Sequence, residues 1–215
     1  MLKRSDIKRE AAKIINEELT VDDSLFLYHD VCTNGIGYVD LMFKTDSIAP
    51  EQIPYLGLLK SVLGYVDTEN YTYGELFNEI NANTGGINCG VEVFDRADST
   101  EEFQAMFSVR GKALYTKMDF LFKMIGEILN SSKLEDTKRL YEIVASVKSR
   151  AQVNLTGAGH STAVLRAAAY SSPMAAFQDE MAGIGYYQFI EKLEKDFEQR
   201  KEAVSYTHLR AHETL

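Results

Sequence analysis

The chain has 215 residues, of which 45% are hydrophobic and 26% are charged, a composition typical of a globular domain and not of a disordered one. Its formal net charge of -9 disfavours binding to nucleic acid or to an anionic membrane, because both are negatively charged. A chain of this length can bury one sizeable core, so one domain with a short extension is expected.

The first part of the chain predicts a helix followed by strands. Residues 2–19 carry apolar residues at helical spacing among many charges, which predicts an amphipathic lead-in helix. A turn is predicted at residues 22–24. Residues 25–29 and 36–45 are rich in strand-forming residues and are expected to pair with each other.

The middle of the chain predicts two helices and an antiparallel pair of strands. Residues 50–66 predict a helix with prolines near its start, where the first turn tolerates them. Tyr73–Asn83 predicts a second, shorter helix that is ended by the glycines after it. Ile87–Asp95 and residues 103–111 alternate between apolar and polar side chains, as expected of antiparallel neighbours with one buried face.

Beyond Thr116 the pattern is helical almost throughout. Residues 157–159 interrupt it, and further helices are expected at residues 160–170 and 186–201. One apolar stripe expected to face the core consists of Met118, Leu121, Phe122, Ile125, Ile128 and Leu129. Strands followed by helices on one antiparallel sheet predict an α+β fold, with the helices packed on one face of the sheet.

No export signal or membrane span is predicted. The basic N-terminus has no apolar segment behind it, and the longest apolar stretch, residues 55–66, is far shorter than the roughly 20 residues that a membrane-crossing helix needs. Cys32 and Cys89 lack the spacing of a disulfide framework or a zinc site. Two buried thiols in a reducing compartment, the cytoplasm, are therefore expected.

The histidine pair His208 and His212 is the metal-like feature of the sequence. Its four-residue spacing places two imidazoles on one helical face, as in zinc-binding helices. Glu213 lies outside the pair, whereas the zinc helices of peptidases need a glutamate between the histidines, where it reaches the metal-bound water. The pair is therefore not predicted to bind metal.

The origin of residues 204–215 gives a second reason against a metal site. Residues 204–214 match, codon by codon, one reading frame of the transposase adapter used to prepare sequencing libraries. They also lack an apolar stripe that could order them. We expect that residues 204–215 are an artefactual tail and not part of the natural protein.

No catalytic or cofactor-binding residue is predicted in the rest of the chain. His29 and His160 are interpreted as polar residues at the ends of a strand and a helix. The glycines of Thr84-Gly85-Gly86, Gly157-Ala158-Gly159 and Gly183-Ile184-Gly185 lack the sequence context of a phosphate-binding loop and are interpreted as turns and caps.

A group of aromatic residues leaves two interpretations open. Tyr65, Tyr71 and Tyr73, with Asn70 between them, either line a binding surface or pack, partly buried, near helix ends; packing is the commoner outcome.

Several short motifs, taken in order, resemble the presequence-protease branch of the insulinase-like zinc metallopeptidases. They begin with Asn34-Gly35-Ile36-Gly37-Tyr38-Val39, Pro54-Tyr55-Leu56-Gly57-Leu58-Leu59 and Asn83-Thr84-Gly85-Gly86-Ile87. They continue with Gly159-His160-Ser161 leading into Arg166-Ala167, and with Gly183-Ile184-Gly185-Tyr186-Tyr187. The order and spacing of these motifs carry the resemblance.

The resemblance implies a clamshell-type α+β domain, the third of four in such peptidases. It implies residues 1–20 as the end of a helical linker between the two halves, residues 21–203 as the domain, and residues 204–215 as the tail. In the family, zinc is bound by an HxxEH helix and a later glutamate of the first domain. An arginine and a tyrosine of the fourth domain act on the substrate carbonyl. None of these segments is in this sequence.

The expected function is therefore that of a non-catalytic domain, inactive alone, of a zinc metalloendopeptidase that degrades unfolded peptides in an enclosed chamber. Its expected partners are the other domains of the same polypeptide and the peptide substrate, with no nucleic acid and no membrane; the zinc would be bound outside this chain. The alternative is a stand-alone scaffold or peptide-binding protein of the same fold without proteolytic activity, like the core subunits of respiratory complexes that keep this fold.

Overall fold

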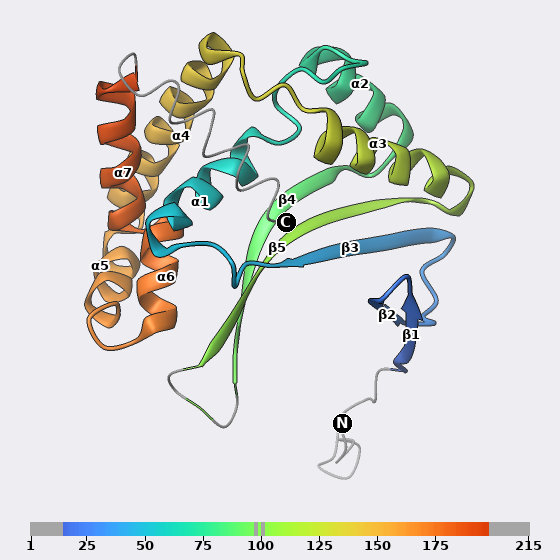
Figure 1. Ribbon diagram of the computed structural model, residues 1–215, viewed down its shortest axis with the longest axis horizontal. Coiled ribbons are helices and arrows are strands. Elements are labelled where there is room, and N and C mark those ends of the chain that lie inside the picture. The colour runs from blue at the N-terminus through green and yellow to red at the C-terminus, as the bar shows by residue number, and fades with distance from the viewer. Residues whose placement is uncertain (1–14, 97–98, 100–101, 198–215) are drawn as a thin grey trace, which may run out of the picture. The chain divides into compact units, whose positions relative to one another are not determined.

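The computed structural model of the protein describes residues 15–96, 99 and 102–197 (Figure 1). Along these residues the chain forms two compact units, with the boundary between Ile36 and Gly37. The predicted division into residues 1–20, 21–203 and 204–215 stays a prediction.

The first unit is a β-hairpin of two strands, β1 (Glu17–Val21) and β2 (Ser24–Tyr28). Asp22 and Asp23 connect the strands with φ angles of 45° and 66°, the left-handed conformation that two-residue type I′ turns require. The turn prediction is thus confirmed. Its positive φ values match the right-handed twist of the flanking strands, so the chain folds back on itself immediately.

Two predictions for this region are wrong. The lead-in helix does not extend over residues 17–19, which belong to β1; residues 1–14 lie outside the described part of the chain. Residues 25–29 do not pair with residues 36–45, because the tight turn gives β2 the preceding segment as its partner. A second turn with φ angles of 53° at Asn34 and 83° at Gly35 leads into β3.

The second unit contains a three-stranded sheet in the order β3-β5-β4. The strands are β3 (Ile36–Lys44), β4 (Ile87–Asp95) and β5 (Phe103–Leu114). β4 and β5 form the predicted antiparallel pair, with Val91 opposite Phe107. β3 lies antiparallel on the other side of β5, since Thr45 bonds to the Ala105 carbonyl at one end and Asp40 pairs with Arg110 further along.

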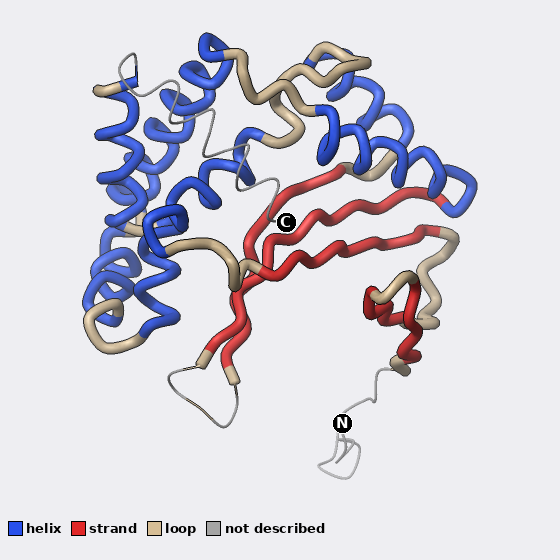
Figure 2. Tube along the Cα trace, viewed as in Figure 1, coloured by secondary structure: helices blue, strands red, loops and turns tan. Residues whose placement is uncertain are grey.

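The helices lie on one face of this sheet, as predicted (Figure 2). Their bounds are η2 Pro50–Gln52, α1 Ile53–Val62, α2 Tyr73–Asn83, η3 Tyr115–Lys117, α3 Met118–Ser131, α4 Thr137–Gly157, α5 Gly159–Ala168, α6 Pro173–Ala182 and α7 Ile184–Lys195. The predicted stripe on α3 is mostly correct, but Phe122 is 49% exposed and Met124 is buried in its place. The predicted helix at residues 186–201 begins two residues earlier, and residues 198–201 lie outside the described part.

Helix α1 belongs to two hydrophobic cores at once. Leu56 and Leu59 pack in the core between the sheet and helices α2, α3 and α6. Leu58 and Val62 pack in a second core with α4 and α7. An almost wholly apolar helix is typical of this position, because it buries opposite faces against different elements.

Across the described residues, no helix is both long and apolar enough to cross a membrane.

Candidate functional site

The outer face of the sheet, opposite the helices, is open. Strand residues alternate, so that Val39, Leu41 and Phe43 pack toward the core while Tyr38 and Met42 point away from it. Tyr38 is 64% and Met42 is 42% exposed, and Phe94 of β4 is also exposed at 44%. An extended surface with several apolar side chains is thus left uncovered by the second unit's own helices.

One arginine ties the three strands together on this outer face. Arg110 of β5 donates from Nε to Asp40 of β3 at 2.7 Å, and its Nη1 pairs with Glu92 of β4 at 3.0 Å. All three side chains are partly exposed, so the pairs add little stability and act mainly to fix the position of the charges. The centre of the outer face is therefore polar, with apolar residues around it.

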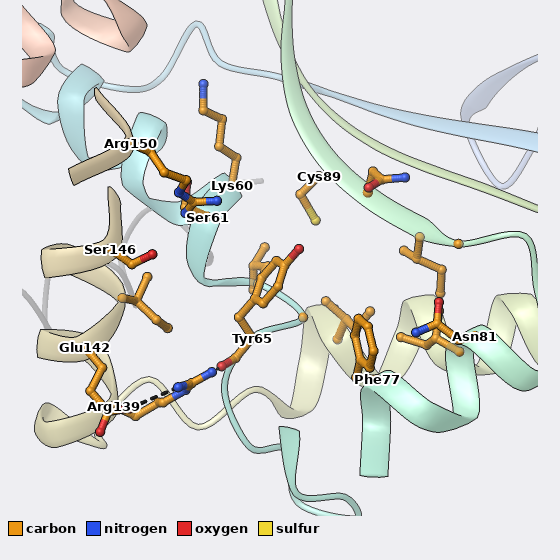
Figure 3. Close-up of a pocket in the computed structure, with 18 residues that line it drawn as sticks. Lys60, Ser61, Tyr65, Phe77, Asn81, Cys89, Arg139, Glu142, Ser146 and Arg150 are labelled. Atoms are coloured by element: carbon orange, nitrogen blue, oxygen red, sulfur yellow. Dashed lines mark hydrogen bonds and ion pairs between the residues drawn. The ribbon is translucent and has the colours of Figure 1, made fainter. Parts of the chain in front are cut away.

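A pocket of about 420 Å³ lies on the opposite, helical side of the sheet (Figure 3). Four elements and the segment after α1 line it: Lys60 and Ser61 from α1, Tyr65 from the following segment, Phe77 and Asn81 from α2, Cys89 from β4, and Arg139, Glu142, Ser146 and Arg150 from α4. Its volume falls within the range typical of small-molecule sites.

Charged groups gather on one side of the pocket. Arg139 donates to the Tyr65 carbonyl at 2.9 Å and pairs with Glu142 at 3.0 Å, and its guanidinium lies 3.9 Å from the centre of the Tyr73 ring. Burial lowers the pKa of Lys60 below its ordinary value, because it disfavours the charged ammonium.

The sulfur of Cys89 faces the pocket from β4 (Figure 3). Burial raises the pKa of this thiol to about 12, so it is protonated at neutral pH and is a poor nucleophile. Cys89 therefore contributes surface to the pocket and not reactivity. The prediction of two buried thiols holds for this partly buried residue and is wrong for Cys32, which is exposed.

The aromatic group left open by the sequence is divided between the two roles. Tyr65 lines the pocket, while Tyr71 packs partly buried against the core and Tyr73 stacks under Arg139. Asn70 forms no part of the pocket lining: its backbone and side chain donate to Glu127 of α3 at 2.9–3.2 Å. The sequence does not predict the pocket, because α1, α2, β4 and α4 are distant from one another along the chain.

Two of the glycine and arginine motifs meet at a buried carboxylate. Asp179 of α6 is 1% exposed and accepts a hydrogen bond from Arg166 at 2.6 Å. It also accepts from the backbone N–H groups of Ile184 and Gly185, at 3.0 and 3.1 Å, where α7 begins. A carboxylate is stabilising at a helix N-terminus, so Asp179 fixes the junction of α5, α6 and α7.

A third motif joins the same region through a close contact. A side chain at Gly57 of α1 would lie 2.9 Å from the ring of Tyr186 and 3.1 Å from the Met181 carbonyl. Only glycine lets α1 approach α6 and α7 this closely. These motifs thus hold helices together, and the interpretation of Gly183 and Gly185 as cap residues is confirmed by the Asp179 hydrogen bonds.

The histidines are placed apart from both surfaces. His29 is in the hairpin unit, where its Nδ1 lies 3.1 Å from the Ile15 carbonyl oxygen, and His160 is exposed in the first turn of α5. His208 and His212 lie outside the described residues. Within the part of the chain that the structure describes, no group of three or more His, Cys, Asp or Glu side chains could hold a metal ion.

Residues 1–193 match the family described as peptidase-associated, for subfamily C of metallopeptidase family 16, and the chain belongs to that family. It is thus a peptidase-related domain with an α+β fold. The resemblance to the presequence-protease branch of the insulinase-like peptidases is thereby confirmed.

Three relatives show how the chain relates to longer proteins. It is 36% identical over 205 residues to "Protein HypA" of Clostridium perfringens, covering 95% of this chain and 21% of the relative. It is 28% identical over 196 residues to "Presequence protease, mitochondrial" of Yarrowia lipolytica, covering 91% and 20%. To "Presequence protease 1, chloroplastic/mitochondrial" of Arabidopsis thaliana it is 27% identical over 204 residues, covering 95% and 19%. The chain therefore spans about one fifth of the length of these relatives.

Proposed function

We propose that the chain is a non-catalytic wall domain of a zinc-dependent metalloendopeptidase whose whole polypeptide degrades unfolded peptides in an enclosed chamber. The observation that carries the proposal is the open outer face of the sheet in a chain that belongs to a peptidase-associated family. The names of the relatives from Yarrowia lipolytica and Arabidopsis thaliana support the peptidase part.

The outer face suits a chamber wall because its chemistry is unselective. Tyr38, Met42 and Phe94 offer apolar contact area to the side chains of an unfolded peptide. Arg110 is already engaged by two carboxylates, so it does not impose a requirement for one charged residue in the peptide. Such a surface favours many peptide sequences to a similar degree.

Zinc does not fit the described residues of this chain, because they hold no group of ligands for it. In the proposal the metal and the residues that act on the substrate belong to other parts of the polypeptide. The contribution of this domain is to keep its partners in place and to limit the space around the substrate, which lowers the entropic cost of reaction.

The proposal predicts that the 215-residue chain alone does not cleave peptides. The purified chain is incubated with a quenched fluorogenic peptide, with and without added zinc, after circular dichroism has shown that it is folded. The Yarrowia lipolytica presequence protease serves as the positive control. Fluorescence is expected to stay at the level of buffer; a zinc-dependent increase that a chelator abolishes would contradict a non-catalytic role.

A further inference from the structure

The pocket between α1, α2, β4 and α4 carries more positive than negative charge. Its lining includes Lys60, Arg139 and Arg150 but a single carboxylate, Glu142, which is already paired with Arg139. Among the described residues, neither Lys60 nor Arg150 has a carboxylate partner. In a chain with a net charge of -9, such a local excess of cations marks a place where an anion is favoured.

Polar groups without full hydrogen bonding lie at the same end of the pocket. Figure 3 shows Lys60, Ser61 and Arg150 together where α1 faces α4. Behind them, the hydroxyl of Tyr186 is buried without a hydrogen-bond partner; Ser61 is its neighbour, but the geometry falls short of a hydrogen bond. A buried hydroxyl without a partner is costly, and a bound polar group near Ser61 and Arg150 would relieve this local deficit.

The opposite end of the pocket is apolar. Phe77 stands there, away from Arg150 (Figure 3). The other apolar residues of the lining are Leu63, Ile80, Ile87, Ile128 and Ile143. A ligand that fills the pocket must therefore present an anion at one end and apolar surface at the other.

We propose that this pocket binds a carboxylate joined to an apolar group, with the carboxylate against Ser61 and Arg150 and the apolar group against Phe77. Arg150 donates to the carboxylate oxygens, Lys60 adds positive charge at the same end, and Ser61 supplies a hydroxyl. The pocket lies on the helical side of the sheet, so the inference does not depend on the wall function of the outer face.

Two sources supply this chemistry, a fatty acid and the C-terminal residues of a peptide with apolar side chains. Isothermal titration calorimetry of the 215-residue chain distinguishes them with two pairs of probes. Decanoate is compared with decanamide, and N-acetyl-leucyl-leucine with its C-terminal amide. In at least one pair the acid is expected to bind with a Kd below about 1 mM and the amide at least about tenfold more weakly, since the amide has no charge.

Four single variants locate the site. Arg150→Gln and Phe77→Ala remove one group from each end of the pocket, and each is expected to weaken binding of the acid about tenfold or more. Lys138→Gln on α4 and Phe122→Ala on α3 make similar changes at exposed positions outside the pocket lining and are expected to bind like the parent chain. Thermal unfolding of every variant confirms that it is folded.

The proposal is overturned if neither acid binds, or if each acid and its amide bind equally well. It is also overturned if folded Arg150→Gln or Phe77→Ala binds as tightly as its control. The pair in which the acid binds identifies the source of the carboxylate. A zinc-dependent peptidase activity of the chain would contradict the proposed wall function and leave this binding result unchanged, so the two failures are distinguishable.

Discussion

Asp179 is the residue on which the helical part of the second unit depends most. Its carboxylate is 1% exposed and serves three donors, two of them backbone groups that nothing else satisfies in the described hydrogen-bond network. Arg166, its ion-pair partner, is 38% exposed, so solvent screens that pair and can replace Asp179 as a partner. The two partners should therefore differ in their importance for stability.

We expect Asp179→Asn to lower the free energy of unfolding by about 3 kcal/mol, because a buried carboxylate that accepts several hydrogen bonds is replaced by an uncharged amide. Arg166→Gln is expected to cost clearly less, because water can solvate the exposed guanidinium. Denaturant unfolding measures both, with exposed Asp119→Asn as the control. Equal losses for Asp179→Asn and Asp119→Asn would contradict the role given to Asp179.

Glu127 has a matching role on the sheet side. It is 9% exposed, and hydrogen bonds from Thr68 and Asn70 hold its pKa below the ordinary value of 4.5. A lowered pKa in the folded state means that the carboxylate contributes stability above the unfolded-state pKa. This contribution is lost as the pH falls through the folded-state pKa.

The resulting prediction concerns the pH dependence of unfolding. Glu127→Gln is expected to cost roughly 1 kcal/mol at about pH 7, and the difference from the parent chain should shrink as the pH falls below the ordinary glutamate value. Exposed Glu135→Gln should show no such trend. Denaturant melts from about pH 3 to pH 7 test this, and a difference that stays constant over the range would exclude Glu127 as the source.

At the scale of elements, α1 shows why a helix can be predicted while its packing cannot. Its apolar composition predicts a buried helix, and the structure confirms residues 53–62 as helical. The sequence does not reveal that Leu58 and Leu59 enter different cores, because the partners of α1 lie as far away as α7.

Two glycines in helix interiors give a matched test of this packing. A methyl group at Gly126 of α3 would meet only the end of the Asn130 side chain at 3.9 Å, whereas one at Gly57 of α1 would meet Tyr186 and Met181 at 2.9 and 3.1 Å. Gly126→Ala is expected to raise the free energy of unfolding by up to about 1 kcal/mol through helix propensity. Gly57→Ala is expected to lower it by about 2 kcal/mol through overpacking. Thermal unfolding with the same sign for both would contradict the close contact of α1.

The predicted and the observed elements differ where local and distant signals compete. Tyr73–Asn83 and Ile87–Asp95 are predicted to the residue, since a Thr72 capping box and flanking glycines mark their ends. The hairpin of the first unit is not predicted, because the apolar spacing of residues 2–19 favours a helix and the Asp22-Asp23 turn outweighs it locally. Tight turns decide strand pairing more firmly than composition does.

At the scale of the whole molecule, sequence motifs lead to the family but not to the surfaces. The glycine motifs that carry the resemblance include packing and capping positions around Asp179 and Tyr186. The open sheet face and the pocket arise from residues brought together by folding, such as Tyr65, Cys89 and Arg150, none of which belongs to a recognisable motif.

The central claim is that this chain is a non-catalytic part of a larger zinc peptidase, and long-read sequencing of the gene tests it most directly. We predict one uninterrupted reading frame that encodes, before Met1, an HxxEH motif followed by a glutamate, and that continues past Ala203 into a further domain in place of residues 204–215. A ribosome-binding site and start codon at Met1, with no such motif upstream in frame, would contradict the account and favour a stand-alone scaffold protein.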